Sequence, residues 1–203
     1  EFTDEKGLTD LYCQVYRGGR SWFPSMVADD TPYRQAAKEG FDPLGDSIKV
    51  AHARGQKVHA WINALRITRN FKAPILTIVG RDAVLQDNYG NSLLDYDDKG
   101  RPPGAIGKYF RLGTPGLWLD PSSKGVRDYL IAVIEDVPRR YPDIDGIHLD
   151  MVRFPYLLPI KPSSSLPGGV DLGYSPRAIR SYLQAGSDLK IQYLNTRINR
   201  KLL

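Results

Sequence analysis

The stretch Asp145-Gly146-Ile147-His148-Leu149-Asp150 is a short apolar run between acidic residues, which is typical of a β-strand. Two further runs have the same character, at 11–16 and at 57–63. All three are nearly continuous rather than strictly alternating. This pattern predicts parallel strands that are covered on both faces.

Helix signals separate these strands. A residue that favours the N-cap stands before proline at Asp42 and again at Asp120, so each is predicted to cap a helix, and Gly55 is a suitable end for the first helix. A third helical region is predicted over 176–202. The resulting order of strand and helix, repeated three times, predicts an α/β fold with a parallel sheet.

Two segments that follow predicted strands are longer than the usual βα loop of about two to six residues. They cover 64–119, with a hairpin predicted at 84–96, and 151–173. Both leave the carboxyl ends of strands, where the active sites of (β/α)8 TIM barrels lie. A full barrel has eight strands in about 250 residues. We therefore expect 1–203 to be a single, incomplete TIM-barrel domain, truncated at both ends, whose sheet edges need the missing barrel portions or another chain.

The composition excludes several classes of protein. The 203 residues are 41% hydrophobic and 25% charged, and no run approaches the roughly 18 apolar residues of a membrane span. The net charge of +5 comes from scattered Lys and Arg, so we favour a solvated surface over a nucleic-acid interface. The single Cys13 excludes an internal disulfide and is predicted to be an inert buried thiol.

No metal and no cofactor are expected. The three histidines have no metal-ligand spacing, and the glycine pair at 18–19 matches neither of the common nucleotide-binding loops.

Asp150 is the most informative candidate for chemistry. It ends its predicted strand, where a TIM barrel places side chains at its mouth. Glycosidases flank the scissile bond with two carboxyl groups, and negative charge stabilises the oxocarbenium-like transition state, so Asp150 could be nucleophile, base or acid. The structural alternative is that Asp150 pairs with Arg153 or caps the following turn. The position at the strand end favours the functional interpretation.

Polar and aromatic side chains recur on the neighbouring strand. By the two-residue period of a strand, His59, Trp61 and Asn63 share one face of 57–63, and His148 shares the face of the aspartate. Amides suit sugar hydroxyls and an aromatic ring suits the face of a sugar, so these four are predicted substrate contacts. Core packing for Trp61, and a hydrogen-bonded core position for His148, remain alternatives.

Further binding contacts are predicted in two segments that follow strands. Tyr16, Arg20 and Trp22 surround the glycine pair after the first strand, and Arg153 follows the third strand. Their rings and guanidinium groups offer stacking and hydrogen bonds to a ligand. A surface turn with an anchoring tryptophan is the alternative for the first segment.

The motifs occur in a fixed order along nearly the whole chain. They are Gln14-Val15-Tyr16-Arg17-Gly18-Gly19-Arg20, Phe41-Asp42-Pro43-Leu44, His52-Ala53-Arg54-Gly55, Val58-His59-Ala60-Trp61-Ile62-Asn63, Trp118-Leu119-Asp120-Pro121, Val126-Arg127-Asp128-Tyr129-Leu130, Tyr141, the stretch 145–150, Arg153-Phe154-Pro155 and Gly173-Tyr174-Ser175-Pro176. This arrangement resembles the glycosyl-hydrolase-like 10 family of bacterial TIM-barrel proteins.

The resemblance implies a barrel distantly similar to the α-amylase clan that acts on glycans. It also implies bacterial cell-envelope polysaccharide as the substrate class and an extracellular or cell-envelope location. By this likeness Asp150 holds the nucleophile position at the end of the fourth family strand, and Asn63 holds the polar position that ends the third. The first family strand and strands five to eight have no counterpart here, and the acid/base carboxylate of such enzymes lies on a later strand.

A carbohydrate-binding domain without hydrolysis is the alternative function. A second carboxylate about 5 to 9.5 Å from the first distinguishes an enzyme from such a module. Within the chain the candidates for it are Asp97, Asp98, Asp120 and Asp171.

Overall fold

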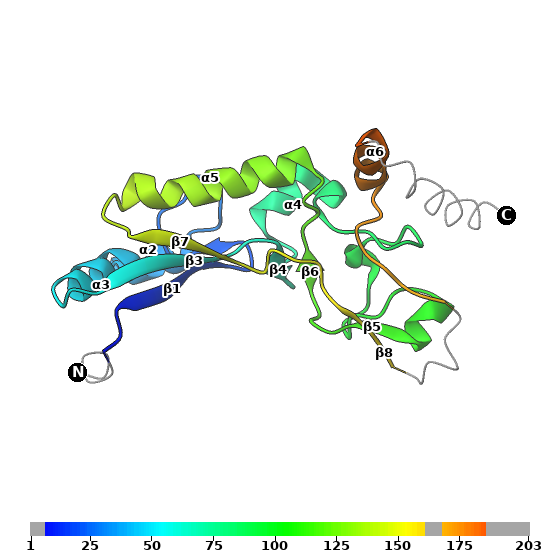
Figure 1. Cartoon of the computed structure of the whole chain (residues 1–203), viewed down its shortest axis with the longest axis horizontal. Helices are drawn as coiled ribbons and strands as arrows, with labels where there is room; N and C mark the ends of the chain where they lie inside the picture. The colour runs from blue at the N-terminus through cyan, green and yellow to red at the C-terminus, as the bar shows by residue number, and fades with distance from the viewer. Residues whose placement is uncertain (1–6, 161–167, 186–203) are drawn as a thin grey trace.

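The protein is a mixed α/β structure built on a small four-stranded sheet, shown by a computed structural model that describes residues 7–160 and 168–185 (Figure 1). The strand order is β2-β1-β3-β7. The first, second and third predicted strands are confirmed, and they are parallel neighbours, whereas the short β2 runs antiparallel to β1. The strands of this sheet are β1 (Asp10–Arg17), β2 (Arg20–Ser21), β3 (Lys57–Asn63) and β7 (Gly146–Asp150).

Helices connect the parallel strands. α2 (Thr31–Lys38) and α3 (Pro43–His52) lie between β1 and β3, and α5 (Lys124–Arg140) lies between β3 and β7. The predicted cap of α3 is confirmed, because the Asp42 side chain accepts a hydrogen bond of 3.1 Å from the backbone N–H of Gly45.

The predicted cap of α5 is wrong. The helix begins after Ser123, and Asp120 closes a turn ahead of it. The Asp120 carboxylate accepts a hydrogen bond from the N–H of Ser122 at 2.9 Å. The backbone carbonyl of Asp120 accepts one from the N–H of Ser123 at 3.0 Å. This local Asx-type turn uses the aspartate before the helix starts. The other carboxylate oxygen of Asp120 is buried and has no hydrogen-bond partner within the described part of the chain.

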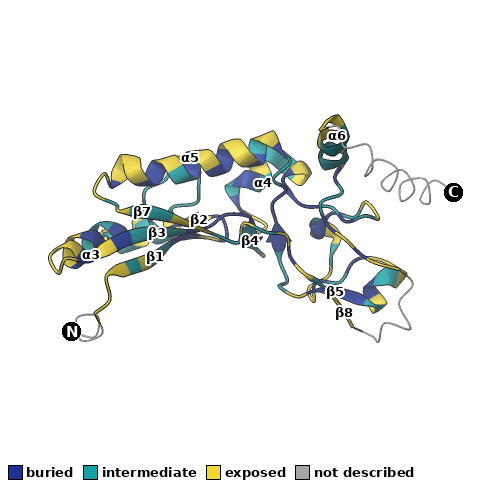
Figure 2. Cartoon of the chain, viewed as in Figure 1, coloured by how far each residue is buried: buried dark blue, intermediate teal, exposed yellow. Residues whose placement is uncertain are grey.

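The core lies between the sheet and these helices, where Figure 2 shows buried residues gathered along α5 and the strands. On β3 the side chains facing the helices, Val58, Ala60 and Ile62, are fully buried. The opposite face of the strand carries His59 and Trp61, which are half-buried. The two faces therefore differ, and the equal coverage predicted for the strands is not seen in the described residues. The helix residues in the same core cluster are Leu44, Ile48, Ala51, Val126, Tyr129, Leu130, Val133 and Val137.

The long segment after β3 has structure of its own, as its length predicts. Its hairpin is shorter than the expected 84–96, because pairing is limited to Gln86 with Ser92 before a 3-10 turn begins. The elements of this segment are β4 (Arg66–Thr68), α4 (Pro74–Val79), the 3-10 helices η1 (Gly80–Ala83), η2 (Leu93–Asp95) and η3 (Ala105–Lys108), β5 (Phe110–Leu112) and β6 (Leu117–Trp118).

Two short sheets organise the long segments, one within the segment after β3 and one between the two segments. β4 pairs antiparallel with β6, and β5 pairs antiparallel with β8 (Leu157–Pro159) of the segment after β7. The final described helix, α6 (Pro176–Gln184), is capped by Ser175, and the rest of the predicted helical region lies outside the described residues. None of the helices in the described ranges is long and apolar enough to cross a bilayer.

We expect Ile62→Ala to lower the free energy of unfolding by about 2–5 kcal/mol, because it leaves a cavity at a fully buried site. Denaturant titration followed by circular dichroism measures the change. The matched control is Ile78→Ala on α4, where the side chain is 61% exposed and the loss should be less than about 0.5 kcal/mol. Equal losses in the two variants would contradict the position of the core.

Candidate functional site

The pairing of β3 with β7 brings Asn63 directly opposite Asp150. The backbone N–H of Ala64 donates to the Asp150 carbonyl at 2.8 Å and continues the pairing past the end of β3. The side-chain oxygen of Asn63 accepts a hydrogen bond of 3.4 Å from Gln14 of β1. Three neighbouring strands therefore contribute polar groups to one edge of the sheet, and the structure brings together the asparagine and the aspartate as the strand pattern predicts.

The Asp150 carboxylate is held by two N–H donors. The indole N–H of Trp61 donates to Oδ2 at 3.1 Å, and the backbone N–H of Met151 donates to Oδ1 at 2.6 Å. Met151 has a φ of 56°, which is uncommon for a residue other than glycine, and it turns the chain sharply after β7. The half-buried aspartate thus has a fixed orientation at the strand end while both oxygens keep further acceptor capacity.

Arg153 does not pair with this carboxylate in the described structure. Its guanidinium group lies over the rings of Trp118 and Tyr156, 5.1 and 4.7 Å from their centroids, and donates to the Phe154 carbonyl at 3.1 Å. The sequence allows two structural roles for Asp150, a cap of the following turn and an ion pair with Arg153. The described residues show the first, through the N–H of Met151, and do not show the second.

A row of aromatic rings runs along the open face of the sheet, from Trp61 beside Asp150 to Tyr12, which pairs with His59. Trp61 and His148 meet edge to face with centroids 6.1 Å apart, and His148 meets Tyr12 in the same way at 5.3 Å. Tyr12 is 54% exposed and His148 is also exposed, whereas Trp61 is half-buried. Sequence reasoning singled out Trp61 and His148 but missed Tyr12 and Gln14, although the two-residue period puts both on the same face of β1.

His59 shares this face but lies toward the other end of the sheet. It pairs with Gly146, four residues before Asp150, which corresponds to about 13 Å along a strand. Its Nε2 is 2.7 Å from Oδ1 of Asp10, and its ring stacks on Tyr12 at 4.8 Å. The hydrogen bond from His59 holds the pKa of Asp10 below its usual value.

Tyr16 lies apart from the other predicted contacts. A β-bulge between Gln14 and Tyr16 shifts the register, so Tyr16 pairs with Ile62 and joins the helix-facing side of the sheet. Its side chain is fully buried, and burial together with the neighbouring Tyr129 raises the pKa of its hydroxyl. Tyr16 is a core residue in this structure, and we do not include it in the site.

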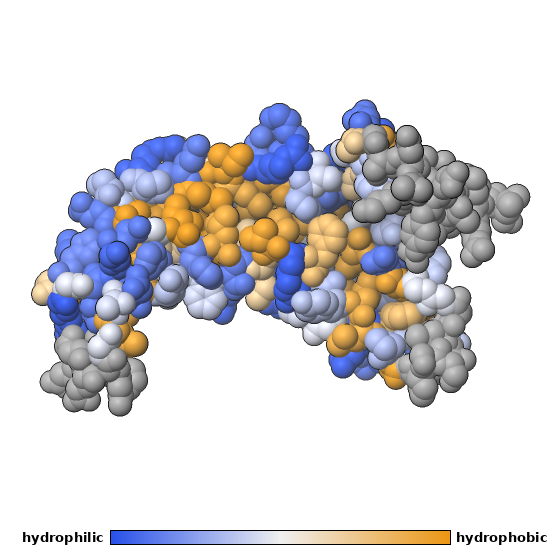
Figure 3. All heavy atoms as spheres, viewed as in Figure 1, coloured by the Kyte–Doolittle hydropathy of each residue, from blue (hydrophilic) through white to orange (hydrophobic). Residues whose placement is uncertain are grey.

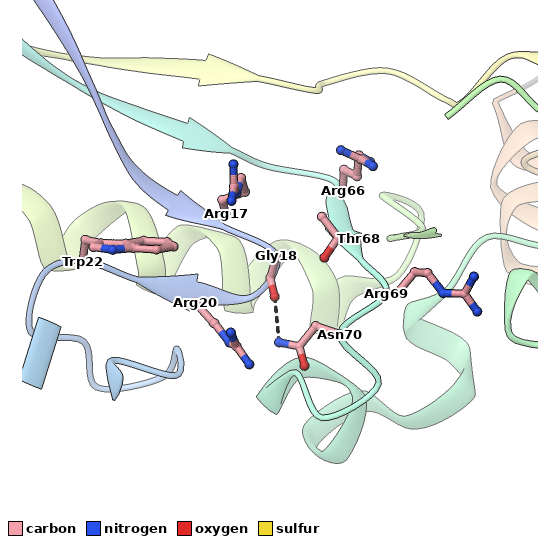
Figure 4. Close-up of a pocket in the computed structure, with 8 residues that line it drawn as sticks. All are labelled: Arg17, Gly18, Arg20, Trp22, Arg66, Thr68, Arg69 and Asn70. Atoms are coloured by element: carbon pink, nitrogen blue, oxygen red, sulfur yellow. Dashed lines mark hydrogen bonds between the residues drawn. The ribbon is translucent and has the colours of Figure 1, made fainter. Parts of the chain in front are cut away.

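Arg20 and Trp22 line a pocket of about 490 Å³ at the ends of β1 and β3 (Figure 4). Sequence reasoning missed the rest of this pocket, because spacing alone does not indicate which arginines converge. The other lining residues are Arg17, Gly18, Arg66, Thr68, Arg69 and Asn70.

The described part of the chain contains no group of three or more His, Cys, Asp or Glu side chains arranged to hold a metal ion. Cys13 is half-buried, and burial raises the pKa of its thiol. A thiol with a raised pKa is a poor nucleophile, which agrees with an inert role.

A model of the family described as Glycosyl hydrolase-like 10 matches residues 2–159. The chain belongs to the glycosyl hydrolase-like 10 family. Among curated proteins it is similar to the glycosyl hydrolase DigH of Escherichia coli strain K12, with 28% identity over 147 residues that cover 71% of this chain and 30% of the relative. Proteins of the same name from Escherichia coli O157:H7 and Shigella flexneri match to the same extent.

Membership of the glycosyl hydrolase-like 10 family confirms the resemblance drawn from the motifs and supports a glycosidase-related role. The chain spans 30% of the length of the curated relatives that it matches.

We expect His59→Phe, which keeps an aromatic ring beside Tyr12, to raise the pKa of Asp10 toward its usual value of about 3.9. Because the pKa of Asp10 is lower in the folded than in the unfolded protein, the ionised carboxylate stabilises the fold at pH values above the unfolded-state pKa. This contribution is lost as the pH falls through the folded-state pKa. The variant should therefore lack this part of the dependence of stability on acid pH. Carboxyl NMR titration measures the pKa. In His148→Phe, the control, the Asp10 pKa should stay low, and a low value in both variants would contradict the assignment.

Proposed function

We propose that this chain is a section of a TIM-barrel glycoside hydrolase in which Asp150 acts at the anomeric carbon, as nucleophile or as charge stabiliser. The observation that carries the proposal is the Asp150 carboxylate at the carboxyl end of the parallel sheet, held by the N–H groups of Trp61 and Met151 beside Asn63. Active sites of TIM barrels lie on this edge. Family membership supports the same class of reaction.

Each neighbouring side chain has a role in this proposal. The fixed carboxylate stabilises the positive charge that develops on the sugar ring, and as nucleophile it bonds to the anomeric carbon while the leaving oxygen takes a proton from an acid. Asn63 is 4% exposed and its oxygen accepts from Gln14, so in this proposal its amide N–H groups are the donors to a sugar hydroxyl. The exposed rings of Tyr12 and His148 and the half-buried ring of Trp61 offer a surface for the sugar face.

The proton donor is assigned to a carboxylate outside the four-stranded sheet. Asp10 is the other carboxylate in those strands, and it lies at the opposite end, paired with His59. Of the loop candidates, Asp97 accepts N–H donors of its own loop and Asp98 pairs with Arg69.

A barrel also accounts for the edge of the sheet at β7. In the order of the described sheet β7 has one neighbour, and Leu149 on this strand is 46% exposed. Figure 3 shows an apolar band that runs below α5, over β7 and toward β8. Another strand and helix at this edge would bury the band, and the greater length of the curated relatives supports such a continuation. The exposed apolar residues on α5, β7 and β8, between these two strands and directly after β8 include Ile131, Leu149, Val152, Phe154, Leu158 and Ile160.

We expect Asp150→Asn to lower the hydrolysis rate by about a hundredfold or more, the scale expected when a central charge-stabilising group is lost. The assay follows new reducing ends released from bacterial cell-envelope polysaccharide by the intact protein. The control is Asp143→Asn, which changes an exposed aspartate at the amino-terminal end of β7 and should leave the rate unchanged. A full rate in Asp150→Asn would refute the catalytic assignment.

The alternative is a carbohydrate-binding domain without hydrolysis. It is favoured by the exposed aromatic row and by the presence of one carboxylate, Asp150, at the carboxyl ends of the described sheet. If the unmodified protein binds the polysaccharide in a pull-down and Trp61→Ala weakens that binding, but no reducing ends appear, the binding function is correct and the hydrolase proposal fails.

A further inference from the structure

An arginine lies at or just after the carboxyl end of each of the three parallel strands. Arg17 is the last residue of β1, Arg66 begins β4 three residues after β3 ends, and Arg153 lies three residues after β7. Because the carboxyl ends of parallel strands meet at one edge, the three guanidinium groups are brought to the same edge as Asp150.

These three arginines have no carboxylate partner within residues 7–160 and 168–185. Arg17 contacts the side-chain oxygen of Gln14 at 3.5 Å. Arg66 donates from Nη2 to the Pro115 carbonyl at 3.2 Å, while its Nε is buried without a hydrogen-bond partner. Arg153 contacts a carbonyl and two rings. Arg17 and Arg66 line the pocket, and Arg153 lies outside its lining. The pocket's other two arginines are paired, Arg20 with Asp29 at 3.5 Å and Arg69 with Asp98.

The positive charges act on one another. Burial, and then the charges of Arg153 and Arg17, lower the pKa of Arg66. A half-buried guanidinium group with unused donors and like charges beside it is unfavourable in isolation. An oxyanion would offset this repulsion and satisfy the donors, and the planar fork of arginine fits carboxylate and phosphate oxygens.

The pocket is shaped by close packing of its walls. Gly18 has a φ of 65°, and a Cβ at this position would lie 2.9 Å from the Thr68 hydroxyl oxygen, so glycine permits the approach of β1 and β4. Asn70 fixes the same corner by donating to the Gly18 carbonyl at 2.7 Å, as the dashed line in Figure 4 marks. In that view Arg17 and Arg66 extend to the same side of the ribbon, whereas Trp22 lies on the other side of β1.

We propose that Arg17 and Arg66, with Arg153 beside them, bind an oxyanion carried by the glycan, so that the substrate is an acidic polysaccharide with carboxylate or phosphate groups. The sugar part of this inference rests on the proposed function, whereas the anion site does not. A polar chain joins the two sites, because Gln14 contacts both Arg17 and Asn63, and Asn63 lies opposite Asp150.

The anion site is tested first with inorganic phosphate by calorimetry at constant ionic strength, so that screening is equal throughout. We expect Arg66→Gln and Arg17→Gln each to weaken phosphate binding by about tenfold or more, the range for a lost hydrogen bond to a charged group. Arg17 is exposed, so its variant serves if Arg66→Gln does not fold. The control, Arg54→Gln, removes an exposed charge before β3 at the opposite end of the sheet. Equal binding by all variants would overturn the site.

The glycan assignment is tested with two oligosaccharides of equal length in the Asp150→Asn background. One alternates N-acetylglucosamine with glucuronic acid, and the other is the same compound after reduction of its carboxyl groups. The proposal is supported if the acidic oligosaccharide binds more tightly than the reduced one and if this difference disappears in the double variant that also carries Arg66→Gln. Phosphate binding without discrimination between the two sugars would identify a site for free anions and overturn the glycan assignment. The rate of Asp150→Asn tests catalysis separately.

Discussion

The register between β3 and β7 is the constraint on which the rest of the site depends. It sets Asn63 against Asp150 and is extended by the Ala64 N–H bond to the Asp150 carbonyl. A slip of one residue would turn the aspartate toward the helices and expose the apolar face. The buried row of Val58, Ala60 and Ile62 prevents such a slip, because each of these side chains is fully enclosed by the helix layer. Core packing and the orientation of the site are therefore set by the same strand.

The edge of the sheet combines two electrostatic features. One is the Asp150 carboxylate held by Trp61 and Met151, and the other is a set of three arginines that have no carboxylate partner among the described residues. A surface in which opposite charges paired with each other would have little attraction for a charged ligand. Here the described contacts keep them separate, since Arg153 rests on aromatic rings instead of on Asp150. Negative and positive groups thus remain available to different parts of one bound molecule.

The sequence predicts the local features of this fold well, but it does not predict which distant residues the fold brings together. The three parallel strands and the cap at Asp42 follow from patterns within a few residues. Tyr16 departs from its predicted role because a bulge changes the face that it occupies, and a bulge leaves no mark in hydrophobic spacing. Asp120 was expected to cap a helix but closes a turn instead. Arg66 lies far in sequence from Arg17 and Arg153, so only the assembled sheet reveals the three together.

The pairing of β5 with β8 joins the two long segments beyond the carboxyl ends of the four-stranded sheet (Figure 1). Three residue pairs, from Phe110 with Pro159 to Leu112 with Leu157, link parts of the chain that are distant in sequence. Residues 151–156, which include Arg153, are therefore tethered at both ends, by β7 on one side and by this ladder on the other. Separation of the two segments at this point would require the loss of the hydrogen bonds between β5 and β8.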